Sequence, residues 1–244
     1  MSTNPPSTMA ATQRPVHYHH GDGVTTVTLD DGKVNAMSPT MQGAIHTALD
    51  QAEADGAPVV LLGRPGVFSA GFDLGILGAG GPEATAMVRG GFELSLRLLA
   101  LPLPVIVGCT GHAIAMGTFL LFSGDYRVGA TGDYRLTANE VAIGLTMPHA
   151  ALAVLAQRLA PSMLNRVAVL AEAVPPSEAV AAGYLDRLVP PDEVEPTARR
   201  LALATAGLDL PSHTATKLRL RTPHLEAIRA GIAADEAGLT GAPT

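Results

Sequence analysis

The chain has 244 residues, of which 47 % are hydrophobic and only 4 % aromatic, with no Trp. This length suits one domain with a large aliphatic core, with or without a helical appendage. The net charge is −6, and no block of Lys or Arg occurs. A nucleic-acid partner is therefore not expected, because binding phosphates needs a basic face.

The N-terminal segment and the apolar stretches indicate neither export nor membrane insertion. Residues 1–14 are polar and rich in Pro, and they lack the apolar run of a secretory signal, so we predict a disordered tail. The apolar stretch over 98–123 is interrupted by Pro and Gly and cannot span a bilayer. Since Cys109 is the only cysteine, no intramolecular disulfide can form, and we expect a cytoplasmic protein with no membrane partner.

Strands and helices alternate after the tail. Residues 24–29 alternate and are β-branched, which predicts a strand. The runs 58–62 and 104–109 have no polar face, which predicts strands buried on both sides. Apolar residues recur at helical spacing over 39–54 and 83–100, which predicts two helices.

The later elements are shorter. Residues 64–82 are rich in Gly and are predicted to be irregular, and residues 111–117 are predicted to form a turn. Helices are predicted over 118–123, 149–160, 161–171 and 177–182, and again from about residue 192. Strands are predicted over 125–129, 134–136 and 185–189. This order implies an α/β fold with buried parallel strands over 15–190 and a helical region over 191–244.

Two glycine-containing segments follow the two buried strands. Residues 67–74 contain Ser-Ala-Gly directly after a strand, which lets the backbone approach a ligand closely. Residues 110–118 open a helix, whose first N–H groups have no intrahelical acceptor. Two such turns at the ends of neighbouring strands can direct two N–H groups at one oxygen atom, which is an oxyanion hole.

Glu140 is a lone carboxylate in the otherwise apolar segment 137–145. Burial raises the pKa of a carboxyl group and makes it a plausible general base. Taken alone, the pattern equally fits an acid that begins a helix and pairs with a nearby cation.

Taken together, these segments resemble the crotonase (enoyl-CoA hydratase/isomerase) family. Residues 68–74 resemble the first oxyanion motif of this family, and residues 111–117 with the Ser-Gly-Asp-Tyr-Arg run at 123–127 resemble the second. Residues 33–37 resemble the turn on the adenine side, and residues 139–148 resemble the catalytic loop. Residues 181–189 resemble the later Ala-x-x-x-Gly-Leu-Val signature. Order and spacing match from about residue 16 to 200.

The resemblance implies a crotonase-like (ClpP/crotonase) spiral of ββα units with a C-terminal helical region that packs trimers, often paired into hexamers. It implies an acyl-CoA thioester substrate, with coenzyme A as part of the substrate, no separate cofactor and no metal. The implied catalytic groups are Glu140 and the backbone N–H groups of Phe72 and Met116. The implied substrate-binding residues are Lys33, Asn35, Ala36, Ala70, Phe72, Asp73, Leu74, Gly75, Met116 and Gly117.

Two positions depart from the family pattern. Family hydratases use two glutamates, and the position of the earlier one is Phe119, which cannot transfer a proton. A single carboxylate suits moving a proton between two carbons, so Δ3-Δ2-enoyl-CoA isomerisation is preferred over hydration. Gly75 stands where many relatives have a cation near the CoA phosphates, and Lys33 or Lys217 is a candidate replacement.

Several alternatives stay open. Besides a hydratase, the chain fits a catalytically silent acyl-CoA-binding protein or a thioester hydrolase that uses Glu140 or His149. Cys109 is expected to be an inert buried thiol and Asp125 a structural acid bonded to backbone amides. The histidines of residues 17–20 are expected to lie on a solvated edge strand rather than to bind a metal.

Overall fold

The computed structural model describes residues 14–240, so the predicted tail at 1–14 lies outside the described residues except for Arg14. Within this range the larger sheet contains β1 (Val16–Gly21), β2 (Val24–Leu29), β3 (Val59–Leu62), β5 (Val105–Cys109), β7 (Tyr126–Ala130) and β9 (Arg187–Val189) in that spatial order. The β1 and β2 strands pair antiparallel, and every other pair is parallel. The strands predicted at 24–29, 58–62, 104–109, 125–129 and 185–189 are thereby confirmed.

A smaller parallel sheet has the order β4 (Gly66–Ser69), β6 (Gly111–Ile114) and β8 (Leu136–Thr137). Consecutive strands from β3 onward alternate between the two sheets, and helices connect the successive pairs. This arrangement is the predicted spiral of ββα units. The expectation of an irregular segment over 64–82 and a turn over 111–117 was wrong, because both ranges contain strands of the smaller sheet.

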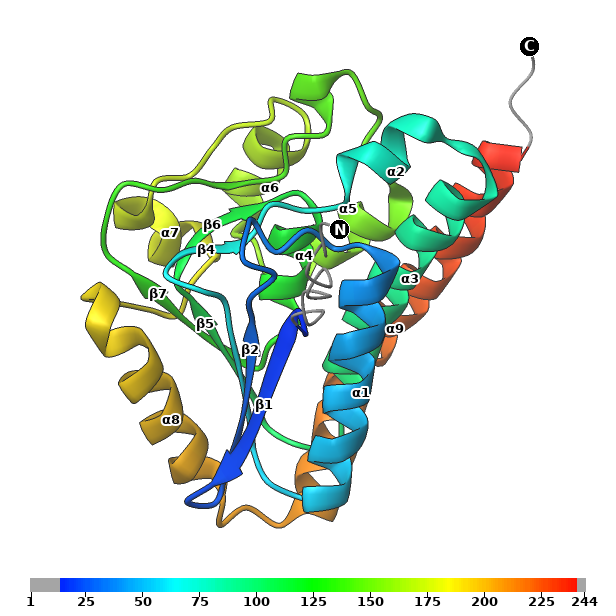
Figure 1. The fold of residues 1–244 in the computed structure, drawn as a ribbon. Coiled ribbons are helices and arrows are strands. Elements are labelled where there is room, and N and C mark those ends of the chain that lie inside the picture. Colours follow the sequence, from blue (N-terminus) through cyan, green and yellow to red (C-terminus); the bar gives the residue numbers. More distant parts are fainter. Residues whose placement is uncertain (1–13, 241–244) are drawn as a thin grey trace, which may run out of the picture.

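Helices cover both faces of the larger sheet (Figure 1). The α8 helix (Val194–Thr205) packs against β5 and β7 on one side, and α1 (Pro39–Asp55) packs against β1 and β2 on the other. The remaining helices are α2 (Leu74–Ala79), α3 (Gly81–Ala100), α4 (Met116–Phe122), α5 (His149–Ala156), α6 (Pro161–Ala168), α7 (Pro176–Ala182) and α9 (Leu210–Thr240), with short 3₁₀ turns η1 (Val141–Ile143) and η2 (Pro191–Glu193).

Local sequence explains the ends of α1. The Ser38 hydroxyl accepts a hydrogen bond from the Met41 N–H at 3.2 Å, and Pro39 occupies the first turn, where its missing N–H costs nothing. The helix ends at Gly56, whose φ of 66° is readily adopted only by glycine. The apolar side chains of α1 then lie toward the sheet and are buried.

The long helix α9 folds back over its own chain and packs against α3 and α5 (Figure 1). Leu225 and Ile228 are consequently buried, at 3 % and 0 % exposure. In contrast, Leu203 of α8 is 45 % exposed. No helix among residues 14–240 is long and apolar enough to cross a membrane.

Candidate active site

The predicted catalytic residues follow the three strands of the smaller sheet. The β4 strand ends at Ser69, β6 at Ile114 and β8 at Thr137, so Phe72, Met116 and Glu140 each lie two or three residues beyond a strand end. Because these strands are parallel, their carboxyl ends lie at the same edge of the sheet.

The first two turns touch each other. A Cβ on Gly71, where φ is +90°, would lie 2.8 Å from the Ile114 carbonyl oxygen and 3.4 Å from the Met116 nitrogen. A Cβ on Gly117 would lie 2.3 Å from the Ser69 carbonyl oxygen. The glycines therefore let the Phe72 turn and the Met116 turn meet backbone to backbone, as an oxyanion hole requires.

The two predicted N–H donors are free to bind a ligand. Met116 is the first residue of α4, where an N–H has no acceptor inside the helix. The Phe72 N–H makes no hydrogen bond within residues 14–240. Ala115 precedes the helix with φ 48° and ψ −120°, a conformation that favours glycine, and its N–H donates to the Thr137 carbonyl oxygen at 2.8 Å.

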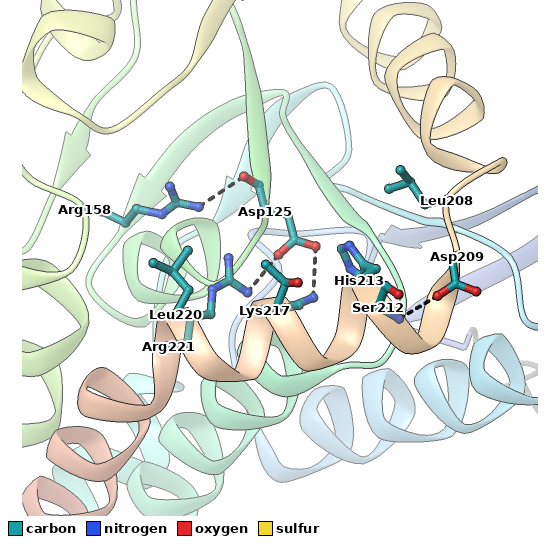
Figure 2. A pocket seen from close by; sticks show the side chains of 10 residues that line it. Asp125, Arg158, Leu208, Asp209, Ser212, His213, Lys217, Leu220 and Arg221 are labelled. Carbon is teal, nitrogen blue, oxygen red and sulfur yellow. Dashed lines mark hydrogen bonds and ion pairs between the residues drawn. The ribbon is translucent and has the colours of Figure 1, made fainter.

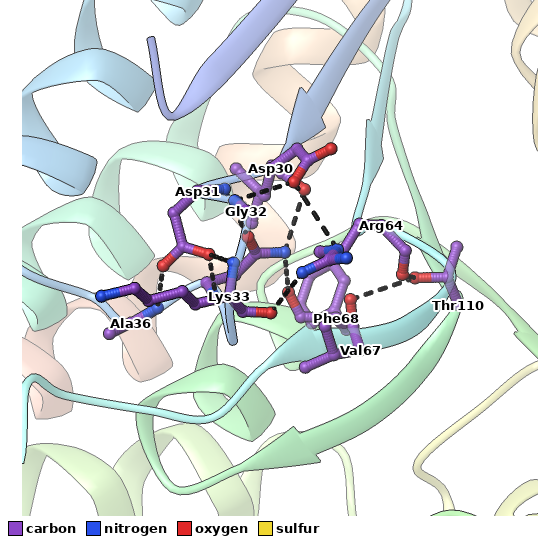
Figure 3. A network of polar contacts seen from close by, with 11 residues as sticks. Asp30, Asp31, Gly32, Lys33, Ala36, Arg64, Val67, Phe68 and Thr110 are labelled. Carbon is purple, nitrogen blue, oxygen red and sulfur yellow. Dashed lines mark hydrogen bonds and ion pairs between the residues drawn. The ribbon is translucent and has the colours of Figure 1, made fainter. Parts of the chain in front are cut away.

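Asp31 organises the predicted adenine-side turn (Figure 3). Its carboxylate accepts hydrogen bonds from the N–H groups of Lys33, Asn35 and Ala36. The Asn35 side chain is fully buried and donates to the carbonyl oxygens of Leu29 and Phe68, so its amide holds the turn against β4.

The same turn lies against the first oxyanion turn. The Ala70 N–H donates to the Val34 carbonyl oxygen at 3.0 Å, and the Met37 N–H donates to the Gly71 carbonyl oxygen at 2.8 Å. A surface cavity of about 550 Å³ opens here. Its lining includes six of the predicted substrate-binding residues: Lys33, Ala36, Ala70, Phe72, Asp73 and Leu74.

Gly75 belongs to α2 rather than to the lining of that cavity. The Asp73 carboxylate accepts hydrogen bonds from the N–H groups of Gly75 and Ile76 and begins this helix. Lys33 is the lysine at the cavity and is exposed. Lys217, the other candidate for the missing cation, is buried against Asp125 elsewhere in the fold, so that suggestion was wrong.

Glu140 is only 7 % exposed. Burial raises the pKa of its carboxyl group to about 7, while a hydrogen bond from its own backbone lowers the pKa by a smaller amount. Its Oε2 atom is buried and has no hydrogen-bond partner among the described residues. Its carbonyl oxygen accepts hydrogen bonds from the N–H groups of Ile143 and Leu145, which fixes the loop.

Apolar side chains occupy the region where a second acid is absent. Phe119 is fully buried, and its ring lies 5.7 Å from that of Phe92, which in turn contacts Phe72 at 6.3 Å. Gly91 makes room for this group, because a Cβ there would lie 2.6 Å from the Phe72 ring and 3.1 Å from Met116 Sδ.

Tyr184 is a candidate that the sequence reasoning did not single out. Its side chain is fully buried, and its hydroxyl has no hydrogen-bond partner among the described residues. Burial raises its pKa, and the charge of Glu140 raises it further, so the two groups interact electrostatically. The only sequence signal was a polar hydroxyl at the Leu position of the Ala-x-x-x-Gly-Leu signature.

The other reactive side chains that the sequence offered are held in contacts outside the proposed site. Cys109 is buried, which raises its thiol pKa to about 12, as expected for an inert thiol. His149 begins α5 and contacts Asp235. Asp125 accepts from the Val105 N–H, as expected for a structural acid, and also pairs with two cations. The histidines of β1 lie on an edge strand, and no metal-ligating cluster occurs among residues 14–240.

Solved structures with the same architecture are similar in sequence to this chain over most of its length. An enoyl-CoA hydratase from Mycobacterium marinum is 50 % identical, with a TM-score of 0.89, over 92 % of this chain and 99 % of that one. An enoyl-CoA isomerase from Mycobacterium tuberculosis is 46 % identical, with a TM-score of 0.88, over 93 % and 98 %. Another structure of that same protein names it a probable enoyl-CoA hydratase.

Curated sequences match over shorter segments. The peroxisomal enoyl-CoA delta isomerase 2 of Arabidopsis thaliana is 30 % identical over 60 % of this chain and 64 % of its own length. The chain spans 46 % to 64 % of the length of the first curated relatives it matches. The model of the enoyl-CoA hydratase/isomerase family matches residues 19–234. The chain therefore belongs to the enoyl-CoA hydratase/isomerase, or crotonase, family.

Proposed function

We propose that the protein is an acyl-CoA enzyme that isomerises Δ3-enoyl thioesters to Δ2-enoyl thioesters, with Glu140 as the general base and acid. The observation that carries this proposal is the buried carboxyl group of Glu140, with a pKa raised to about 7, combined with a buried phenyl ring at position 119. One carboxylate that titrates near neutral pH can both take and return a proton.

The proposed reaction needs only the substrate and groups of this chain. Glu140 removes a proton from C2 of the substrate, and the electron pair passes to the thioester carbonyl, forming a dienolate. The N–H groups of Phe72 and Met116 donate to the resulting oxyanion, each contributing about 3 kcal/mol of barrier lowering. Glu140 then returns the proton to C4, which leaves the double bond between C2 and C3.

The substrate-binding proposal follows the same loops. Lys33 contributes a cation near the phosphates of coenzyme A, and the cavity lined by Ala70, Phe72 and Leu74 receives the thioester end. No separate cofactor or metal is part of this reaction, and a cytoplasmic location remains our prediction.

Hydration is the second candidate, and a specific observation favours it. Thr137 Oγ1, Asn139 Oδ1 and the Tyr184 hydroxyl are buried near the catalytic loop without hydrogen-bond partners among the described residues. Buried polar atoms of this kind often hold an ordered water. Glu140 would take a proton from such a water as the water oxygen adds to C3 and would return a proton to C2, so hydration would need no second carboxylate.

Parallel incubations with 3-enoyl-CoA and 2-enoyl-CoA, followed by mass-resolved chromatography, separate the candidates. Isomerisation leaves the mass unchanged, and hydration adds one water. We expect conversion of 3-enoyl-CoA, its loss in Glu140→Gln, and normal turnover in Glu178→Gln, which removes an exposed carboxylate. Addition of water to 2-enoyl-CoA selects the hydratase, and release of free CoA a hydrolase. Binding without turnover makes the protein an acyl-CoA binder.

A further inference from the structure

Basic side chains surround a pocket of about 490 Å³ beside the first half of α9 (Figure 2). Arg158 reaches it from the end of α5, Asp125 from the start of β7, and Lys217 and Arg221 from consecutive turns of α9. None of these side chains belongs to the residues assigned to the thioester site, so a ligand in this pocket would be independent of the proposed reaction.

A single carboxylate serves two of these cations. Asp125 Oδ2 lies 2.9 Å from Lys217 Nζ, and Oδ1 lies 2.8 Å from the guanidinium of Arg221. Oδ2 also accepts the Val105 N–H at 2.7 Å. Both cations are almost wholly buried, at 6 % and 8 % exposure, so little solvent screens their charge.

Arg158 has no carboxylate partner among the described residues. One of its terminal nitrogens donates to the carbonyl oxygens of Gly124 and Asp125, and no ion pair neutralises its charge. The neighbouring Arg127 is already paired with Asp186. Burial, followed by repulsion from Arg127 and Arg221, lowers the pKa of Arg158 to about 10.

The remaining titratable groups at the pocket do not neutralise its excess positive charge. Asp209 lies at the exposed rim, where its carboxylate accepts the Ser212 N–H. The pKa of His213 is lowered by burial and then by Lys217, which favours the neutral ring. The pKa of Lys217 is lowered to about 8, mainly by burial, with repulsion from Arg221 adding to the effect. Positive charge therefore exceeds negative charge inside the pocket.

We propose that this pocket binds a small oxyanion, of the phosphate or carboxylate type, held by Arg158 together with Lys217 and Arg221. A planar guanidinium with unused N–H groups matches two oxygens of such an anion. Ammonium and guanidinium groups on α9 face the same space (Figure 2), and the Ser212 and Thr216 side chains line it as well. The anion supplies the charge that Asp125 alone does not.

Thermal unfolding and isothermal titration calorimetry with inorganic phosphate test the proposal, with NaCl holding ionic strength constant. We expect a saturable rise in Tm and measurable heat of binding. Arg158→Gln removes a charge-assisted contact and should weaken phosphate binding roughly tenfold or more. Arg229→Gln, which removes an exposed arginine of the same helix, should leave binding unchanged. A parallel titration with acetate distinguishes a carboxylate ligand from a phosphate.

Phosphate and acetate effects no larger than that of chloride at equal ionic strength would overturn the proposal, and this wild-type comparison needs no variant. Equal affinity in Arg158→Gln and the wild type would also overturn it. If Arg158→Gln does not fold, Arg158→Lys keeps the charge but loses the planar fork, and weaker binding is again expected. A change of molar mass in the Arg158 variant, without any anion effect in the wild type, assigns the pocket to subunit contact instead.

Discussion

Glu140 carries a proton in the folded protein at a pH where a free glutamate has lost it. Its pKa is 4.5 in an unperturbed chain and about 7 in the fold. Between these values the folded state holds more protons than the unfolded state, so the stability of the fold falls as the pH rises through this window. Above pH 7 the full cost of a buried charge is present.

Glu140→Gln should therefore stabilise the protein in a pH-dependent manner. We expect little gain at pH 4.5 and a gain on the order of 3 kcal/mol above pH 7, because Gln stays neutral. Urea unfolding at pH 5 and pH 8 measures the difference. The same gain at both values would mean that burial does not perturb this carboxyl group.

Ala115 adopts a backbone conformation suited to glycine, at the residue that directs the Met116 N–H. Such strain costs about 1–3 kcal/mol, and glycine removes it at an entropic cost of about 0.5–1 kcal/mol. We expect Ala115→Gly to raise stability by about 1 kcal/mol, measured by chemical denaturation. Ala227→Gly, at an exposed site inside α9, should instead lower stability by about 1 kcal/mol. Two losses of similar size would show that position 115 is unstrained.

At the scale of elements, the smaller sheet and the start of α4 are in van der Waals contact. A methyl group on Gly117 would meet the Ser69 carbonyl at 2.3 Å, and backbone atoms cannot move aside as a side chain can. Gly117→Ala should therefore displace the oxyanion turn and lower kcat/KM by roughly 100- to 1,000-fold, while circular dichroism stays near that of the wild type. Gly78→Ala, which meets nothing within 4 Å in α2, should keep normal activity.

The α5 helix begins without a cap from its own segment and receives one from α9. The Asp235 carboxylate accepts the His149 N–H at 2.8 Å and the Ala150 N–H at 3.1 Å. Asp235→Ala should lower stability by about 1–2 kcal/mol, because it removes a cap and a charge at a helix N-terminus. Glu226→Ala, an exposed carboxylate on the same helix, is the matched control. Equal unfolding midpoints for both variants would contradict this role.

Sequence patterns identified the elements whose side chains are buried in a regular order. The apolar runs of β3 and β5 and the helical spacing of α1 and α3 left little ambiguity. In contrast, α2 has no buried residue to produce a periodic pattern, and the hydrogen bonds to Asp73 determine where it starts. The short strands β4 and β6 contain glycine and exist through pairing between distant segments, which local composition does not reveal.

At the scale of the whole molecule, apolar side chains remain on the surface. Val169 and Leu170 after α6 are 60 % and 71 % exposed, and Leu220 on α9 is 74 % exposed. The homotrimer that the family resemblance implies would cover such residues. Light scattering should then give three times the 25.0 kDa of one chain, about 75 kDa, or twice that for a hexamer. A measured mass equal to that of one chain would show that the protein forms neither a trimer nor a hexamer in solution.

Long-range placement limited the prediction of the site. Glu140 and the two glycine-containing turns were candidates because each follows an apolar strand or lies in an apolar run, and the family resemblance implied their roles. That α9 turns back onto α3 and α5 was not, because this depends on packing between segments far apart in sequence. Lys217 was misjudged for the same reason, since its partner Asp125 lies 92 residues away.

The cap that Asp235 provides has a consequence for synthesis of the chain. A ribosome makes His149 long before Asp235, because 86 residues separate the two partners. During translation, α5 and the Glu140 loop before it must therefore remain without the Asp235 cap until α9 has emerged from the ribosome. A nascent chain that is cut or stalled before residue 235 would therefore carry every proposed catalytic group and still lack this cap on α5.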